Sequence, residues 1–200
     1  MQWMARTLRL DSLPAVEAQA RRLPPGAGQD GLSVLPFLSG ERAPGWAPDA
    51  TAAITGVTKA TTPVHLYRAG LEAVALRLGR IVELLAAAGA LGAGARVGAS
   101  GTALERSPLW RQMLADVLGM EVVLGRVSEA TSLGAALLMA EALFGVGEGV
   151  EVGPEEEEDG AVAARHVPDA AAHVVYKEVM RRQTALYDAL YPPAVTSASV

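Results

Sequence analysis

The residues best suited to chemistry lie in one glycine-rich stretch, between positions 96 and 134. Gly98, Ser100 and Gly101 leave the backbone bare where a short apolar run ends, and Ser107 followed by a proline is a typical helix start. A bare backbone beside the first turn of a helix is a place where a nucleotide can lie. The same pattern is typical of an ordinary turn between a strand and a helix, and its spacing is not that of a P-loop. The spacing alone leaves both interpretations open.

A second polar group lies in the turn-rich loop 39–49, which contains Glu41, Arg42 and Trp46. A carboxylate, a guanidinium and an indole in one irregular loop suit contacts with a polar ligand. The alternative is a solvated loop in which Trp46 closes the edge of the core. His65 and Arg68, in the first turns of the helix that follows, are best explained as part of a solvated helix face.

Apolar periodicity predicts the elements that must position these residues. We expect helices over residues 1–23, 62–88, 107–119, 135–144 and 168–191, and strands over residues 31–38, 52–57, 121–124 and just before the bare turn. The helix 135–144, with its small residues, is expected to pack tightly. Buried stripes are expected from Leu71 to Leu85 and at Val175, Val179, Leu186 and Leu190. Strands that alternate with helices predict an α/β domain in which helices cover a sheet.

The composition excludes several classes of protein. The chain has 200 residues, of which 50% are hydrophobic, so it can bury the core of one globular domain. Its net charge is −5 and it has no basic stripe interleaved with aromatic residues, so a nucleic-acid partner is not expected. It has no cysteine, which excludes disulfides and thiolate zinc sites and fits a reducing, cytoplasmic compartment.

Other sequence features argue against a membrane or metal site. No apolar stretch reaches the length of a membrane helix, and the N-terminus is too short in apolar residues for a secretory signal. The three histidines lack metal-ligand spacing. The run of glutamates at 155–158 belongs to an expected surface loop over 145–159, and we interpret it as a solvated face.

Four motifs, taken together and in order, resemble the C-terminal half of the FGGY carbohydrate kinases, which include gluconokinases, xylulokinases and glycerol kinases. The first, LPFLSGERAPGW at 35–46, is close to that family's LPYLSGERTPxW. The second is AAITGV at 52–57, then seven residues, then HLYRAGLE at 65–72, with Gly70 where a slightly larger residue is usual. The third, ASGTALERSPLW at 99–110, is most similar to gluconokinase-type members, and the fourth is EATSLGAA at 129–136.

This resemblance implies a fold and a set of ligands. The fold would be an actin-like ATPase (ribonuclease H-like) lobe, a mixed sheet covered by helices, with ATP or ADP and Mg²⁺ held between two lobes. The adenosine would lie against the turn at Ser100, Gly101, Thr102 and Ala103, with Ser107 near the base and the loop 131–134, ending in Gly134, shaping the same pocket. Glu41, Arg42 and Trp46 would border the sugar site. Thr102 replaces a usual glycine, so we expect strain there if φ is positive.

The resemblance also limits what the 200 residues can do. The family's first lobe carries the phosphate-binding hairpins, most sugar contacts, most Mg²⁺ ligands and the catalytic aspartate, and none of the seven aspartates here has that context. We therefore expect ATP-dependent phosphorylation of a sugar or sugar-acid hydroxyl, of gluconate or pentulose type, with an N-terminal lobe or second subunit as partner.

The alternative is a non-catalytic binding or scaffold protein derived from such a kinase. In either case residues 1–30 would be a helix and linker from the inter-lobe region, 31–191 the nucleotide-side domain, and 192–200 a frayed tail.

Overall fold

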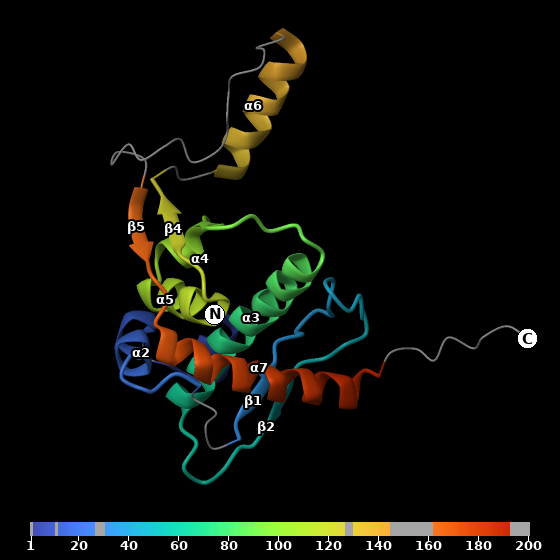
Figure 1. Cartoon of the computed structure of the whole chain (residues 1–200). Helices are drawn as coiled ribbons and strands as arrows, with labels where there is room; N and C mark the ends of the chain where they lie inside the picture. Colours follow the sequence, from blue (N-terminus) through green and yellow to red (C-terminus); the bar gives the residue numbers. More distant parts are fainter. Residues whose placement is uncertain (1, 11, 27–30, 127–129, 145–161, 193–200) are drawn as a thin grey trace, which may run out of the picture.

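The computed structural model describes residues 2–10, 12–26, 31–126, 130–144 and 162–192 (Figure 1). In chain order the elements are α1 (Gln2–Thr7), α2 (Leu13–Ala20), β1 (Ser33–Leu35), β2 (Ala53–Thr55), α3 (Pro63–Ala87), β3 (Val97–Ala99), α4 (Thr102–Glu105), α5 (Pro108–Leu118), β4 (Val122–Gly125), α6 (Ala130–Phe144), β5 (Val162–His166) and α7 (Ala170–Leu190). Among these described elements, no helix is both long and apolar enough to cross a membrane.

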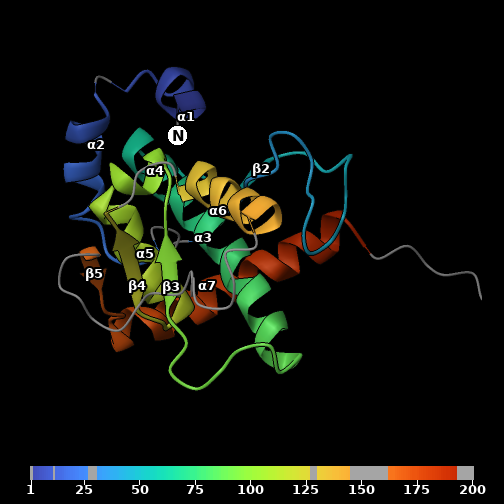
Figure 2. The ribbon, with the colours of Figure 1, turned by 90° about the horizontal axis from the view of Figure 1, so that it is seen from above.

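The strands form two small sheets. β1 and β2 pair antiparallel, whereas β4 lies between a parallel neighbour, β3, and an antiparallel one, β5. The buried face of the second sheet carries Val122, Ala99 and Leu124, and α5 packs against it. Figure 2 shows β3 and β4 side by side with α5 beneath them. The predicted α/β class, a mixed sheet with covering helices, is confirmed.

The long helix α3 is the centre of the domain, and it packs against α2, α5, α7 and β1. Its start is fixed locally, as predicted, because the Thr62 hydroxyl accepts the N–H of His65 while the His65 ring accepts the N–H of Thr62. The predicted apolar stripe is buried only in its first half. Leu78 and Leu85 are 41% and 43% exposed.

The N-terminal segment differs from the predicted single helix. α1 ends at Thr7, shortly before Arg9, whose φ is 51°, and α2 begins after its cap Ser12, whose hydroxyl accepts the N–H of Ala15. The break follows from Ser12 and the proline at position 14, which favour a new helix start over continuation. α1 lies across α3 at Gly70, where an added Cβ would collide with the thioether of Met4. A larger residue at position 70 would require the side chain of Met4 to move.

The C-terminal part also departs from prediction. β5 was not anticipated, because its alternating small residues beside the predicted loop gave a weak strand signal. α7 begins at its Asp169 cap, but Leu190 is 48% exposed, while Tyr176 and Gln183 are buried instead. Residues 145–161 and 193–200, including the predicted glutamate-rich loop and most of the predicted frayed tail, lie outside the described ranges.

α6 does not pack tightly, contrary to prediction. It begins at Ala130, five residues earlier than expected, and in Figure 1 it extends beyond the end of β4. Leu138, Met139 and Leu143 are each at least 60% exposed. Apolar residues cover almost the whole circumference of this helix. Such a pattern predicts that the helix is buried, but it does not identify the surface against which the helix packs.

Candidate functional site

The candidate nucleotide turn lies at the carboxyl edge of the mixed sheet. β3 and β4 are parallel, so the turn after Ala99 and the connection after Gly125 leave the sheet at the same edge (Figure 2). In open α/β sheets, ligands bind outside this edge. Ser100, Gly101 and the two residues after them are all exposed there. The structure therefore brings these four predicted residues together on one accessible surface.

The glycines of this turn leave space above the backbone. A Cβ added at Gly98 or at Gly101 would meet no atom of the described residues within 4 Å. Gly101 has φ 92°, a conformation that side chains disfavour, and it stands directly before α4. Glycine is therefore required at position 101 because of its positive φ, whereas position 98 has room for a side chain.

Thr102 does not have a positive φ, so the condition for the expected strain is not met. It is the first residue of α4, a four-residue helix that the sequence did not predict. Apart from glycines, the described residues with positive φ are Arg9 and Trp46. The residue with a positive φ is Gly101, one position earlier, so a β-branched residue fits at position 102 without strain. Its exposed side chain stands beside the turn.

The other two predicted nucleotide-side residues occupy different settings. Ser107 is 1% exposed, and its hydroxyl accepts the N–H of Trp110 at 3.2 Å as the cap of α5. Gly134 lies inside α6 rather than in a loop, because the helix already starts at Ala130. The predicted loop 131–134 is wrong. The structure therefore does not place Ser107 on the exposed surface of the turn.

The loop 39–49 separates its three candidate residues. Glu41 is buried, paired with Arg77 of α3, and it accepts the hydroxyl of Tyr187 at 2.6 Å. Arg42 is exposed and Trp46 is 73% exposed, so the alternative in which Trp46 closes the core edge is wrong. Of the three, Glu41 has a structural role, while the other two face solvent.

Aromatic rings pack against the buried pair of Glu41 and Arg77. The guanidinium of Arg77 lies 4.5 Å from the ring centroid of Tyr187 and 5.4 Å from that of Phe37. Burial, followed by the hydrogen bond to Glu41, raises the pKa of Tyr187 to about 12. A Cβ at Gly45 would overlap the Tyr187 hydroxyl, which explains the glycine in this loop. Glu41 is therefore engaged by Arg77 and Tyr187, and its predicted contact with a sugar stays a prediction.

A second buried network corrects the interpretation of Arg68 as part of a solvated face. Arg68 is 4% exposed, and it donates to Glu72 at 2.8 Å and to the carbonyl of Ala20 at 2.6 Å. The hydroxyl of Tyr176 donates to Glu72 at 3.0 Å. The network joins α2, α3 and α7, so it is a structural feature of the core rather than a ligand site.

The sequence reasoning also missed Arg111. This residue lies three and four positions before the buried Leu114 and Ala115, so helical spacing alone places it on the inward face of α5. Its guanidinium reaches α4, the helix that follows the turn. Within the described part of the chain, no three histidine, aspartate or glutamate side chains gather as a metal site.

Replacing Gly101 with valine should lower the free energy of unfolding by about 1–3 kcal/mol, because a β-branched residue is strained at φ 92°. Gly98→Ala is the matched control: it adds a Cβ to the same turn where the space is open and φ is not positive. Urea unfolding followed by circular dichroism measures both variants. Equal stabilities of the two variants would show that the turn tolerates other conformations.

The fold and the position of the turn define an actin-like α/β lobe. Residues 2–143 match the FGGY family of carbohydrate kinases, C-terminal domain. The chain therefore belongs to the FGGY carbohydrate kinase family and represents its C-terminal domain. This assignment agrees with the four motifs, which lie in β1 and its following loop, β2 and α3, the β3 turn with α5, and the start of α6.

Individual relatives are consistent with this assignment. The chain is 39% identical over 134 residues to a gluconokinase from Bacillus licheniformis, covering 67% of this chain and 25% of the relative. It is 37% identical over 134 residues to a glycerol kinase from Thermus brockianus, covering 67% and 26%. The structure of xylulose kinase from Rhodospirillum rubrum superposes with a TM-score of 0.73 at 32% identity, covering 96% of this chain and 37% of that chain. The chain thus spans about a quarter of the length of the curated relatives it matches.

Proposed function

We propose that this chain forms the nucleotide-side lobe of a sugar kinase that transfers the γ-phosphate of ATP to a hydroxyl of a sugar or sugar acid. One observation carries the proposal: in a chain of the FGGY family, the motif around residues 99–110 forms a bare, exposed turn at the carboxyl edge of parallel strands. This edge is where open α/β sheets bind ligands. Relatives named gluconokinase, xylulose kinase and glycerol kinase support a sugar, a sugar acid or a related polyol as acceptor.

In this proposal the adenosine lies against the turn Ser100–Ala103. The exposed backbone of Gly101 allows close approach, and the side chain of Thr102 borders the ligand. Mg²⁺ enters with the nucleotide phosphates, which supply oxygen ligands for it. The catalytic base, the phosphate donors and most sugar contacts come from an N-terminal kinase lobe or a second subunit, since phosphoryl transfer needs these groups in one cleft.

The nucleotide site is tested by thermal unfolding with and without MgADP. Binding to the folded chain raises its melting temperature by mass action, so MgADP should stabilise the parent chain. Thr102→Trp should abolish this shift, because a bulky exposed side chain blocks the turn without disturbing the core. Ala171→Trp, exposed in the first turn of α7, is the control and should retain the shift. A parent chain that MgADP does not stabilise would favour the alternative, a non-catalytic binding or scaffold protein.

Catalysis is tested by adding a separately produced N-terminal lobe. With MgATP and gluconate, xylulose or glycerol, the mixture should release ADP with at least one acceptor, whereas the chain alone should not. The acceptor that gives the highest kcat/KM identifies the sugar class. Association of the two lobes without ADP release for any acceptor would contradict the proposed activity.

A further inference from the structure

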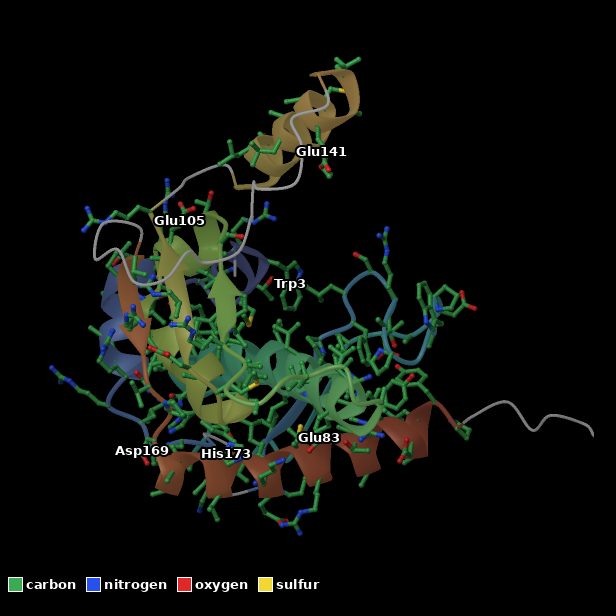
Figure 3. All side chains as sticks on the ribbon, turned by 45° about the horizontal axis from the view of Figure 1, so that its top comes forward. Trp3, Glu83, Glu105, Glu141, Asp169 and His173 are labelled. Atoms are coloured by element: carbon green, nitrogen blue, oxygen red, sulfur yellow. The ribbon has the colours of Figure 1, made fainter. Side chains whose placement is uncertain are left out.

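The guanidinium of Arg111 holds the carbonyl end of α4. Arg111 is buried on α5, and its Nη1 donates to the carbonyl oxygens of Leu104 and Glu105, the latter at 2.9 Å. Carbonyl groups at the end of a helix lack partners within the helix. α4 is four residues long and its cap, Gly101, offers no side chain, so these bonds attach a marginal helix to the core. In Figure 3, the labelled residue Glu105 marks the position of α4 at the upper edge of the sheet.

The other side of the same guanidinium contacts His166 at the end of β5. The Nε of Arg111 donates to Nε2 of His166 at 3.0 Å, which requires Nε2 to be unprotonated. The network then assigns the ring proton to Nδ1, which donates to Oε1 of Gln112 at 3.2 Å. Gln112 in turn donates to Asp116 at 2.8 Å, and Asp116 accepts the backbone N–H of Asp169 at 2.9 Å. One hydrogen-bonded chain thus runs from α4 to the cap of α7.

We propose that Arg111 is a positioning residue that holds α4, and with it the turn Ser100–Ala103, against the sheet edge while His166 is neutral. Protonated His166 cannot accept the Nε–H of Arg111, and it would place two cations in contact. The guanidinium then has to turn away, and α4 loses its attachment. The inference rests on the proposed function only where it connects α4 to nucleotide binding.

The surroundings of His166 determine the direction of its titration. Arg111 and Asp116 face it from α5, Arg21 follows α2, and Glu17 of α2 acts on Arg111. Burial, followed by the charge of Arg111, lowers the pKa of His166 below its ordinary 6.5, and Asp116 opposes this shift. Because the folded-state pKa is the lower one, the contribution to stability is present above about pH 6.5 and is lost as the pH falls through the folded-state pKa.

NMR of the full chain tests the attachment of α4 directly. In Arg111→Met the backbone chemical shifts of residues 102–105 should lose their helical values. The amides of residues 104–107, which donate to carbonyls of the turn and of α4, should lose protection about tenfold or more, the order expected for lost hydrogen bonds to a charged group. Arg106→Met removes a charge beside the same helix from an exposed position and should change neither. If Arg111→Met does not fold, Arg111→Lys keeps the stem and charge but lacks the forked donors, and it should give the same loss. Retained helical shifts in both Arg111 variants would overturn the proposal.

Acidification provides a readout that a purely structural role would not give. Between pH 7.5 and 5 the helical shifts of 102–105 should decline in the parent chain and not in His166→Gln, whose amide oxygen accepts from Arg111 at any pH. MgADP affinity should fall about tenfold in Arg111→Met and stay constant in Arg106→Met. Equal pH responses of the parent and His166→Gln, or unchanged MgADP affinity with α4 lost, would contradict the proposal. If the parent chain does not bind MgADP but α4 still depends on Arg111, the proposed function fails and the anchoring role is supported.

Discussion

Replacing Glu72 with glutamine is expected to lower the free energy of unfolding by about 3 kcal/mol or more, because it removes one partner of a buried ion pair. Glu72 accepts from Arg68 at 2.8 Å, from Tyr176 at 3.0 Å and from the backbone N–H of Gly26 at 3.0 Å. The substitution leaves the Arg68 guanidinium buried without its counter-charge. Chemical unfolding monitored by circular dichroism measures the loss.

Glu83→Gln on the same helix is the matched control. Glu83 pairs with Arg80 and with Lys177, but these side chains are between 35% and 45% exposed, so its loss should cost less than about 1 kcal/mol. Figure 3 shows Glu83 on the surface where α3 faces α7. Similar losses for Glu72→Gln and Glu83→Gln would mean that the buried network contributes no more than a surface pair.

Glu41→Gln should also cost about 3 kcal/mol, although sequence reasoning placed Glu41 beside a sugar. The Glu41 and Arg77 side chains are 2% and 10% exposed, and the pair attaches the loop 39–49 to α3 and α7. The neighbouring substitution Arg42→Gln, at an exposed position, should change stability by less than about 0.5 kcal/mol. The same unfolding experiment measures both variants.

A double variant separates the charge pair from the packing around it. Glu41→Leu with Arg77→Met removes both charges, and it should be more stable than Glu41→Gln because no buried charge is left unpaired. If Glu41→Gln instead keeps full stability and weakens only sugar-dependent catalysis, Glu41 acts on the substrate and the structural role assigned here is wrong.

The helix starts were predictable because their signals are local. Thr62 and Ser107, each followed by a proline, cap α3 and α5 through bonds that span three residues, and Gly119 ends α5 with φ 64°. A pattern of this kind can be read in a short window of sequence. α4 and β5 were missed because they are short and weakly patterned, and α4 depends on a guanidinium from another helix.

The structure shows where the candidate site residues lie, while their contact with a nucleotide stays a prediction. The turn Ser100–Ala103 was identified from its glycines and from the family motif, and it lies exposed at the sheet edge. Ser107 was singled out for a ligand but caps a helix, since the same hydroxyl suits both roles. Arg111 drew no attention because arginines on amphipathic helices are usually solvated, although its spacing from Leu114 and Ala115 places it on the inward face of α5.

The sequence by itself determined the family, the α/β class, the main helices and the glycine turn, all of which depend on residue types at short, fixed spacings. The tertiary structure decided what the charged residues do. Glu41 meets Tyr187 across 146 positions and Glu72 meets Tyr176 across 104, so their partners come from folding rather than from local pattern. Burial then converts what would be weak surface charges into the contacts that hold the lobe together, because a charge removed from water requires a partner.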